Sequence, residues 1–373
     1  MKINSFGVED FLNVYETRAT LDIAQSTITS FTFEELLKTC NKTENEVFDE
    51  IKDFKLNYGF IEGSPKFKTE VKKLYRRNEN ELDVLATNGA TGANFLVLYT
   101  LLEEGDHIIA HYPSYQQLYD IPLSFNVEVS HLDIDENNNW LPNLDSLESM
   151  IKPNTKMICL NNAQNPTGAY MDEDYLNKLV DIAKKYDLYV LCDEVYKPFE
   201  KDLKIASIID LYHKGISTNS LSKTYSVPGL RVGWVCANNE IIDMMRKYRD
   251  YTMICIGVLD DYFATLVLEN KDKVLARNEK IIYENYEILK EWIKKEELAS
   301  CILPKHISTS FVKLDVKMPI EDFCIKLLED TGILLVPGSR FGYESYVRLG
   351  YCAKKEVLIE ALDKLSTYMH NLI

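Results

Sequence analysis

The sequence is poor in positive charge. Its 373 residues include 42 lysines and arginines against 58 aspartates and glutamates, a formal net charge of −16 at pH 7. A surface with this excess of negative charge is repelled by phosphate backbones and by anionic lipid headgroups. We therefore expect neither a nucleic-acid nor a membrane partner.

Long apolar runs and paired cysteines are also missing. No window of 18 residues is apolar enough to suggest a membrane-spanning helix, and the N-terminus has no signal-peptide core. The eight cysteines are scattered without paired spacing, and Cys159, Cys192 and Cys236 lie in apolar runs typical of buried strands. This usage favours free thiols in a reducing cytoplasm over a disulfide framework.

Two common ligand signatures are absent as well. The segment 88–93 (NGATGA) joins an expected strand to an expected helix, but it has neither the P-loop pattern nor the dinucleotide glycine pattern. His107 and His111 have the spacing of a helical metal-binding pair, yet their segment is strand-like and would hold them about 13 Å apart. The sequence predicts no metal site.

The chain does contain many alternating strand and helix patterns. A chain of 373 residues exceeds the size of one hydrophobic core. Strand-like runs alternate with amphipathic helices from about residue 45 to 240, which predicts a mainly parallel, doubly wound α/β sheet. Short strands and helices follow, as in a small α+β domain. We expect a large domain over 45–275 and a smaller unit formed by 276–373 and the arm 1–44, which shows no clear element before Phe33.

The segment 220–231 (SLSKTYSVPGLR) holds the first candidate site. Its serine, glycine and proline content predicts a loop. The amine of Lys223 can form a Schiff base with an aldehyde. The hydroxyls of Ser220 and Ser222, with the guanidinium of Arg231 eight residues beyond the lysine, can hold a phosphate. Such a loop suits a phosphorylated aldehyde.

A second candidate site follows the apolar run 188–192. Asp193 comes directly after it, where open α/β sheets bind ligands. Tyr196 lies three residues on. Asn165, in the turn sequence Asn-Pro-Thr-Gly, precedes Asp193 by 28 residues, and Lys223 follows it by 30. This order and spacing is more specific than any one of the pieces.

Together these segments resemble the pyridoxal-phosphate (PLP) site of the fold-type I enzymes, the class I/II aminotransferases of the aspartate aminotransferase superfamily. The resemblance implies that Lys223 carries the cofactor and acts as general acid and base. It implies that Asp193 keeps the pyridine nitrogen protonated, so that the ring can accept electrons. It also implies that Tyr196 and Asn165 bond the 3′-oxygen of the cofactor.

The resemblance further implies how the rest of the ligands are held. The run 337–342 (PGSRFG) followed by Arg348 on a strand matches the family's substrate-carboxylate segment, so Arg348 should clamp the α-carboxylate with help from Asn165. Tyr58 should reach the cofactor phosphate of a neighbouring subunit, which implies a homodimer with shared sites. Arg340 replaces a commonly small residue, and we assign it no role. The remaining expected cofactor contacts are Ala90, Thr91, Tyr115, Ser220, Ser222 and Arg231.

The activity implied by the resemblance is amino-group transfer between an L-amino acid and a 2-oxo acid. Enzymes of this fold can instead expel a group from Cβ, so a C–S lyase, a β-replacement enzyme or a cyclising enzyme is the alternative. Those lyases often carry histidine where this chain has Tyr196, which favours transamination. A PLP-sensing transcription regulator is disfavoured by the acidic charge and by the short chain ahead of the fold. The sequence leaves the amino acid and the oxo acid open.

Overall fold

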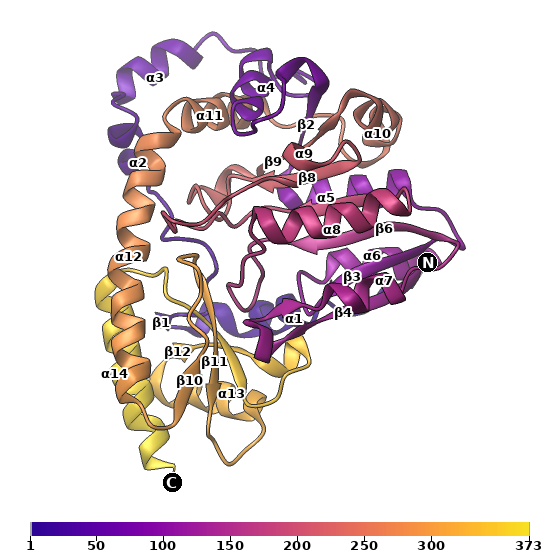
Figure 1. Ribbon diagram of the computed structural model, residues 1–373. Coiled ribbons are helices and arrows are strands. Elements are labelled where there is room, and N and C mark those ends of the chain that lie inside the picture. Colours follow the sequence, from indigo (N-terminus) through magenta and orange to yellow (C-terminus); the bar gives the residue numbers. More distant parts are fainter. Residues whose placement is uncertain (1, 373) are drawn as a thin grey trace.

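The largest feature of the computed structural model, which describes residues 2–372, is an eight-stranded sheet (Figure 1). Five neighbouring strands, β8, β7, β6, β3 and β4, are parallel, whereas β2, β9 and β5 pair antiparallel. The predicted mainly parallel sheet is confirmed. In spatial order the strands are β2 (Leu82–Asn88), β9 (Val232–Asn238), β8 (Gly215–Ser220), β7 (Tyr189–Asp193), β6 (Thr155–Asn161), β3 (His107–Tyr112), β4 (Glu128–Asp135) and β5 (Leu141–Pro142).

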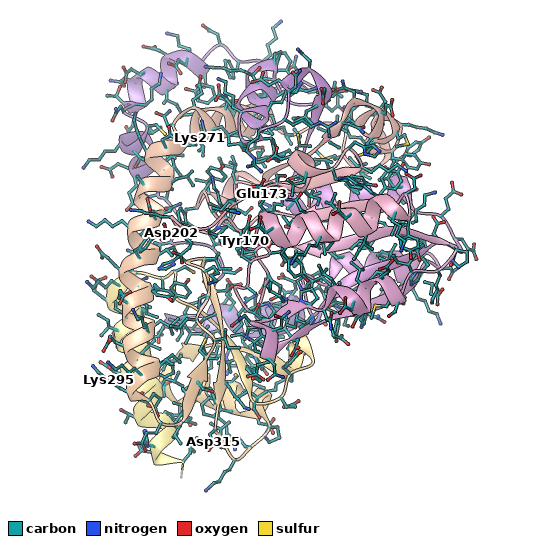
Figure 2. The ribbon with its side chains drawn as sticks, viewed as in Figure 1. Tyr170, Glu173, Asp202, Lys271, Lys295 and Asp315 are labelled. Carbon is teal, nitrogen blue, oxygen red and sulfur yellow. The ribbon has the colours of Figure 1, made fainter. Side chains whose placement is uncertain are left out.

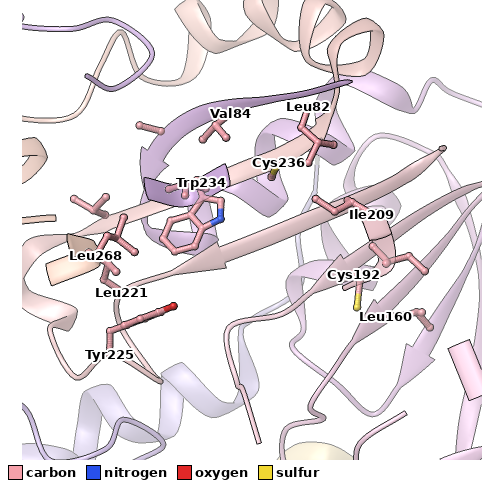
Figure 3. Packing of buried hydrophobic residues seen from close by; sticks show 14 of the residues in the cluster. Leu82, Val84, Leu160, Cys192, Ile209, Leu221, Tyr225, Trp234, Cys236 and Leu268 are labelled. Atoms are coloured by element: carbon pink, nitrogen blue, oxygen red, sulfur yellow. The ribbon is translucent and has the colours of Figure 1, made fainter. Parts of the chain in front are cut away.

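Helices cover both faces of this sheet. Successive strand residues point to opposite sides, and apolar residues on both sides need to be buried. On β6, Cys159 joins one hydrophobic core while Ile158 and Leu160 join the other. Figure 3 shows the second core, in which Trp234 lies near Val84. The first core includes α5 (Gly89–Leu101), α6 (Gln117–Ser124) and α10 (Asn239–Thr252); the second includes α2 (Phe33–Thr39), α3 (Glu44–Ile51), α4 (Pro65–Lys72), α7 (Leu144–Ser149), α8 (Glu173–Lys185), α9 (Ile208–Leu211) and α11 (Val258–Glu269).

A smaller α+β unit lies beside the large sheet, as predicted. Its antiparallel sheet has the order β10 (Ala299–Cys301), β11 (Thr309–Leu314), β14 (Tyr346–Gly350) and β13 (Val336–Pro337). Strand β1 (Leu21–Asp22) pairs in parallel with β12 (Ile333–Leu334). These strands share a third core with α13 (Ile320–Thr331) and α14 (Lys355–Asn371).

Helix α12 (Lys271–Lys295) runs along both units, and Figure 2 labels its two ends. Val274 is buried in the core of the large sheet, and Leu289 is buried in the core of the small unit. The helix therefore links the two cores. The domain limits at 44/45 and 275/276 stay a prediction. No helix within residues 2–372 is both long and apolar enough to cross a membrane.

The arm contains a helix that the sequence analysis missed. Helix α1 (Gly7–Tyr15) precedes Phe33, so the expectation of no earlier element is wrong. The helix has no side-chain cap at its start, and its stability comes from tertiary packing, since Val8 and Phe11 are buried in the core of the small unit. Helix α2 begins after Thr32, which forms a capping box with Glu35.

Candidate active site

One cavity of about 520 Å³ lies where the large sheet, the small unit and the arm meet, within the usual size of a small-molecule site. It brings together eleven of the twelve predicted site residues, all except Tyr58. They come from the start of α5, the loop after β3, the ends of β6, β7 and β8 with the turns that follow them, the loop before β9, and β14. The eleven lining residues are Ala90, Thr91, Tyr115, Asn165, Asp193, Tyr196, Ser220, Ser222, Lys223, Arg231 and Arg348.

Asp193 ends β7 as a fully buried carboxylate. Its Oδ2 accepts a hydrogen bond of 2.7 Å from Asn94 Nδ2, and its Oδ1 accepts one of 3.2 Å from the backbone N–H of Val195. Burial raises the pKa of Asp193 to about 6, because desolvation outweighs these hydrogen bonds. A carboxylate of this kind gains most from a cationic partner, such as a protonated pyridine.

The amine of Lys223 faces the arm. Its Nζ donates to Ser26 Oγ at 2.9 Å and lies 3.4 Å from Thr27 Oγ1. Burial, followed by the positive charge of Arg348, lowers the pKa of Lys223 to about 8. A lysine with this pKa has a substantial neutral fraction near neutral pH, which a nucleophilic amine requires.

The residues predicted to bind a phosphate lie around the start of α5 and the loop before β9, and their role stays a prediction. Gly89, Ala90 and Thr91 form the first turn of α5, whose backbone N–H groups have no partner within the helix. A Cβ at Gly233 would lie 2.4 Å from the carbonyl carbon of Gly89 and 2.7 Å from the nitrogen of Ala90. A Cβ at Gly89 would lie 2.8 Å from a terminal nitrogen of Arg231. Gly89 therefore lets Arg231 approach this turn, and Gly233 lets β9 approach it.

The two residues predicted to bind the substrate, Arg348 and Asn165, are in contact, and their role stays a prediction. Arg348 on β14 is only 4% exposed, and its terminal nitrogens donate to Asn165 Oδ1 at 3.3 Å and to the carbonyl of Ala24 at 2.9 Å. Its Nε has no hydrogen-bond partner in the described part of the chain. Arg348 lines the cavity, and a planar guanidinium in that position is suited to an incoming carboxylate.

The three predicted tyrosines differ in position. Tyr115 lies 3.5 Å from the Thr91 hydroxyl, and burial raises its pKa to about 12. Tyr196 is buried in the cavity wall, and burial raises its pKa well above the ordinary value. Tyr58 is 67% exposed and does not line the cavity of its own chain. Its predicted contribution to a neighbouring subunit stays a prediction.

Two further features of the site escaped the sequence analysis. Asn94 lies inside α5, donates to Asp193 and accepts a 2.6 Å hydrogen bond from Thr218 Oγ1. The one signal in the sequence is that Asn94 is a polar residue among the apolar positions of this helix. Arg340, left without a role, pairs with Glu321 and lies over the ring of Phe11.

The pKa of Lys223 can be tested in the cofactor-free protein. Labelling of Lys223 by trinitrobenzenesulfonate, followed by peptide mapping, should show a midpoint near pH 8, because only the neutral amine reacts. The labelling rate should rise about tenfold per pH unit below the midpoint and then level off. Arg348→Met should move the midpoint to higher pH, since it removes a nearby positive charge. A wild-type midpoint of about 10, as in an exposed lysine, would contradict the described environment.

Comparisons with known proteins agree with this geometry. Residues 26–365 match the family "Aminotransferase class I and II". The crystal structure of a PLP-dependent aminotransferase from Streptococcus suis is 52% identical, with a TM-score of 0.97, and the match covers 100% of this chain and 99% of that one. Aspartate aminotransferase of Thermotoga maritima is 29% identical over 80% of this chain and 78% of its own.

A relative with a different name also matches. Capreomycidine synthase of Streptomyces vinaceus is 25% identical over 361 residues, which cover 96% of this chain and 92% of the relative. The family match spans nearly the whole chain and includes every residue that lines the cavity from large sheet and small unit. The chain therefore belongs to the class I and II aminotransferase family and is a pyridoxal-phosphate-dependent enzyme.

Proposed function

We propose that the enzyme transfers an amino group between an L-amino acid and a 2-oxo acid. The observation that carries this proposal is the placement of Lys223, Asp193 and Arg348 around one cavity. Together they supply a nucleophilic amine, a buried anion and a carboxylate anchor. Bound PLP supplies an electron sink for the charge that develops at the substrate Cα.

In this proposal each polar residue of the site has a separate task. Arg348 and Asn165 bind the α-carboxylate and orient the Cα–H bond towards Lys223. Lys223 takes the Cα proton and returns it at a neighbouring carbon. Asp193 holds a proton at the pyridine nitrogen, and Tyr196 donates to the 3′-oxygen. Tyr115 stacks on the pyridine ring. The cofactor phosphate is anchored by five further residues, Ala90, Thr91, Ser220, Ser222 and Arg231.

A second candidate function is loss or replacement of a group at Cβ, including cyclisation. The relative named capreomycidine synthase supports this alternative, because a synthase rather than an aminotransferase aligns over 96% of the chain. The same residues would serve it, since removal of the Cα proton by Lys223 is common to both reactions. Tyr196, where such lyases often have histidine, favours transfer.

The fate of the amino nitrogen distinguishes the two functions. The holoenzyme is incubated with a panel of 15N-labelled L-amino acids and either pyruvate or 2-oxoglutarate, and products are analysed by mass spectrometry. We expect the label in alanine or glutamate, with Lys223→Ala lower by several orders of magnitude because the proton-transfer group is gone. Label appearing only as ammonium, above all from a Cβ-substituted donor such as cystathionine, would contradict transfer and support the alternative.

We also propose that the enzyme is a homodimer with shared sites and works in the cytoplasm. Tyr58 lies among exposed apolar residues, since Leu56 is 81% exposed and Phe60 57% exposed, which supports a partner on this surface. The eight cysteines are all free, which supports a reducing compartment.

Mixing two defective variants tests the shared site. Tyr58→Ala should weaken cofactor phosphate binding in the partner's site, and Lys223→Ala should inactivate its own site. A mixed dimer then has one site with both defects and one with neither, so an equimolar mixture after subunit exchange should recover about a quarter of wild-type activity. Size-exclusion chromatography monitors dimer formation. Failure to recover activity in mixed dimers would contradict the shared site.

A further inference from the structure

Helix α1 and the turn after it form one wall of the active-site cavity. Glu9, Leu12 and Glu16 all line the cavity, and their spacing of three and four residues puts them on one helix face. The adjoining face of the helix is anchored, since Val8, which also borders the cavity, and Phe11 are buried in the small-unit core. The arm therefore presents two carboxylates to the space in which substrate binds.

The start of α1 is also fixed to the loop that carries Tyr115. The N–H of Gly7 donates to Gln116 Oε1 at 2.8 Å, and Gln116 Nε2 donates to the carbonyl of Ser5 at 2.7 Å. The rings of Phe6 and Tyr115 lie 5.2 Å apart. Glu9 is thus held at a defined position, two residues beyond an anchored backbone group.

The two carboxylates differ in their contacts. Glu16 accepts a 2.7 Å hydrogen bond from Gln25 Nε2. The carboxylate of Glu9, an exposed residue, makes no hydrogen bond or ion pair with any residue between 2 and 372, although it lines the same cavity as Lys223 and Arg348. Its negative charge also counters the lowering of the pKa of Lys223 by burial and by Arg348. Glu9 is therefore an acid without a protein partner in the cavity wall.

The basic residues of the cavity wall have other partners. Arg231 donates to the carbonyl of Pro228 at 3.1 Å, Arg340 pairs with Glu321, and Lys223 donates to Ser26. Arg348 is the one buried residue among the arginines that line the cavity in the described chain. The Nε atoms of Arg348 and Arg340 both lack a hydrogen-bond partner, but the charge of Arg340 is paired with Glu321, which leaves Arg348 to bind one carboxylate. A second carboxylate on the substrate would meet Glu9 and Glu16, and the guanidinium of Arg340 in the same wall is already paired with Glu321.

We propose that the substrate is an L-amino acid with a positively charged side chain, an amine or a guanidinium, and that Glu9 determines this specificity by pairing with that charge. The inference rests on the proposed function, because it takes Arg348 as the anchor of the α-carboxylate. Opposite charges at the two ends of the ligand then match Arg348 and Glu9. Dicarboxylic amino acids are rejected by like-charge repulsion.

Binding of α-methyl amino acids to the holoenzyme tests the proposal without any turnover. These analogues have no Cα proton, so their dissociation constants, measured by absorbance titration and calorimetry, are the same whether the enzyme transfers or eliminates. We expect α-methylornithine or α-methylarginine to bind more tightly than neutral α-methylleucine, and α-methylaspartate to bind most weakly. Comparison of α-methylornithine with α-methylarginine shows whether the site prefers an amine or a guanidinium.

Matched variants on α1 assign the effect to Glu9. Glu9→Gln should weaken binding of the cationic analogue about two- to fivefold, the size of an exposed ion pair, and leave α-methylleucine unchanged. Glu9→Lys should shift the preference towards α-methylaspartate. Asp10→Asn removes the same charge from the next residue, which does not line the cavity, and should change nothing.

The opposite outcomes would overturn the proposal. The proposal is wrong if α-methylaspartate binds more tightly than the cationic analogues, if all analogues bind equally, or if none binds. It is also wrong if Glu9→Gln and Asp10→Asn weaken binding of the cationic analogue equally. Failure of the proposed function is separate, since it would appear as label in ammonium in the nitrogen-transfer experiment even if the cationic analogues bind as expected.

Discussion

The hydrogen bond from Asn94 to Asp193 is the interaction on which the rest of the site depends. It joins α5 to the end of β7, and the hydroxyl of Thr218 on β8 extends it to a third element. A buried carboxylate is costly unless it is paired, and burial raises the pKa of Asp193 to about 6. Above that pH the charge is present, held by one amide and one backbone N–H, and oriented towards the cavity that a cationic ring would enter.

The position of α5 links this anion to the phosphate end of the cavity. The same helix that carries Asn94 begins at Gly89, so its first turn and its hydrogen bond to Asp193 are placed together. Gly233 permits the close approach of β9 to that turn. The distance between the two ends of the site is therefore set by a rigid helix rather than by loops.

Sequence reasoning recovered the residues that follow strands and turns. Asp193, Asn165 and Lys223 stand in short motifs whose order along the chain reflects the order of strands in a doubly wound sheet, so their meeting in one cavity was predictable. The places of Asn94 and Glu9 in the site were not predictable, because each depends on how its helix packs against an element that is distant in the sequence. Helix α1 itself was missed since its stability comes from burial of Val8 and Phe11 rather than from capping or length.

The central claim is that the buried Asp193 carboxylate keeps the cofactor ring protonated. The direct measurement is the 15N chemical shift of the pyridine nitrogen in enzyme reconstituted with 15N-labelled PLP, followed from about pH 6 to pH 9, across neutral pH where an unpaired ring nitrogen would lose its proton. The wild-type shift should be that of a protonated ring throughout, and Asp193→Asn should give the shift of a neutral ring with cofactor still bound. A neutral ring in the wild type, or a protonated ring in Asp193→Asn, would contradict the account.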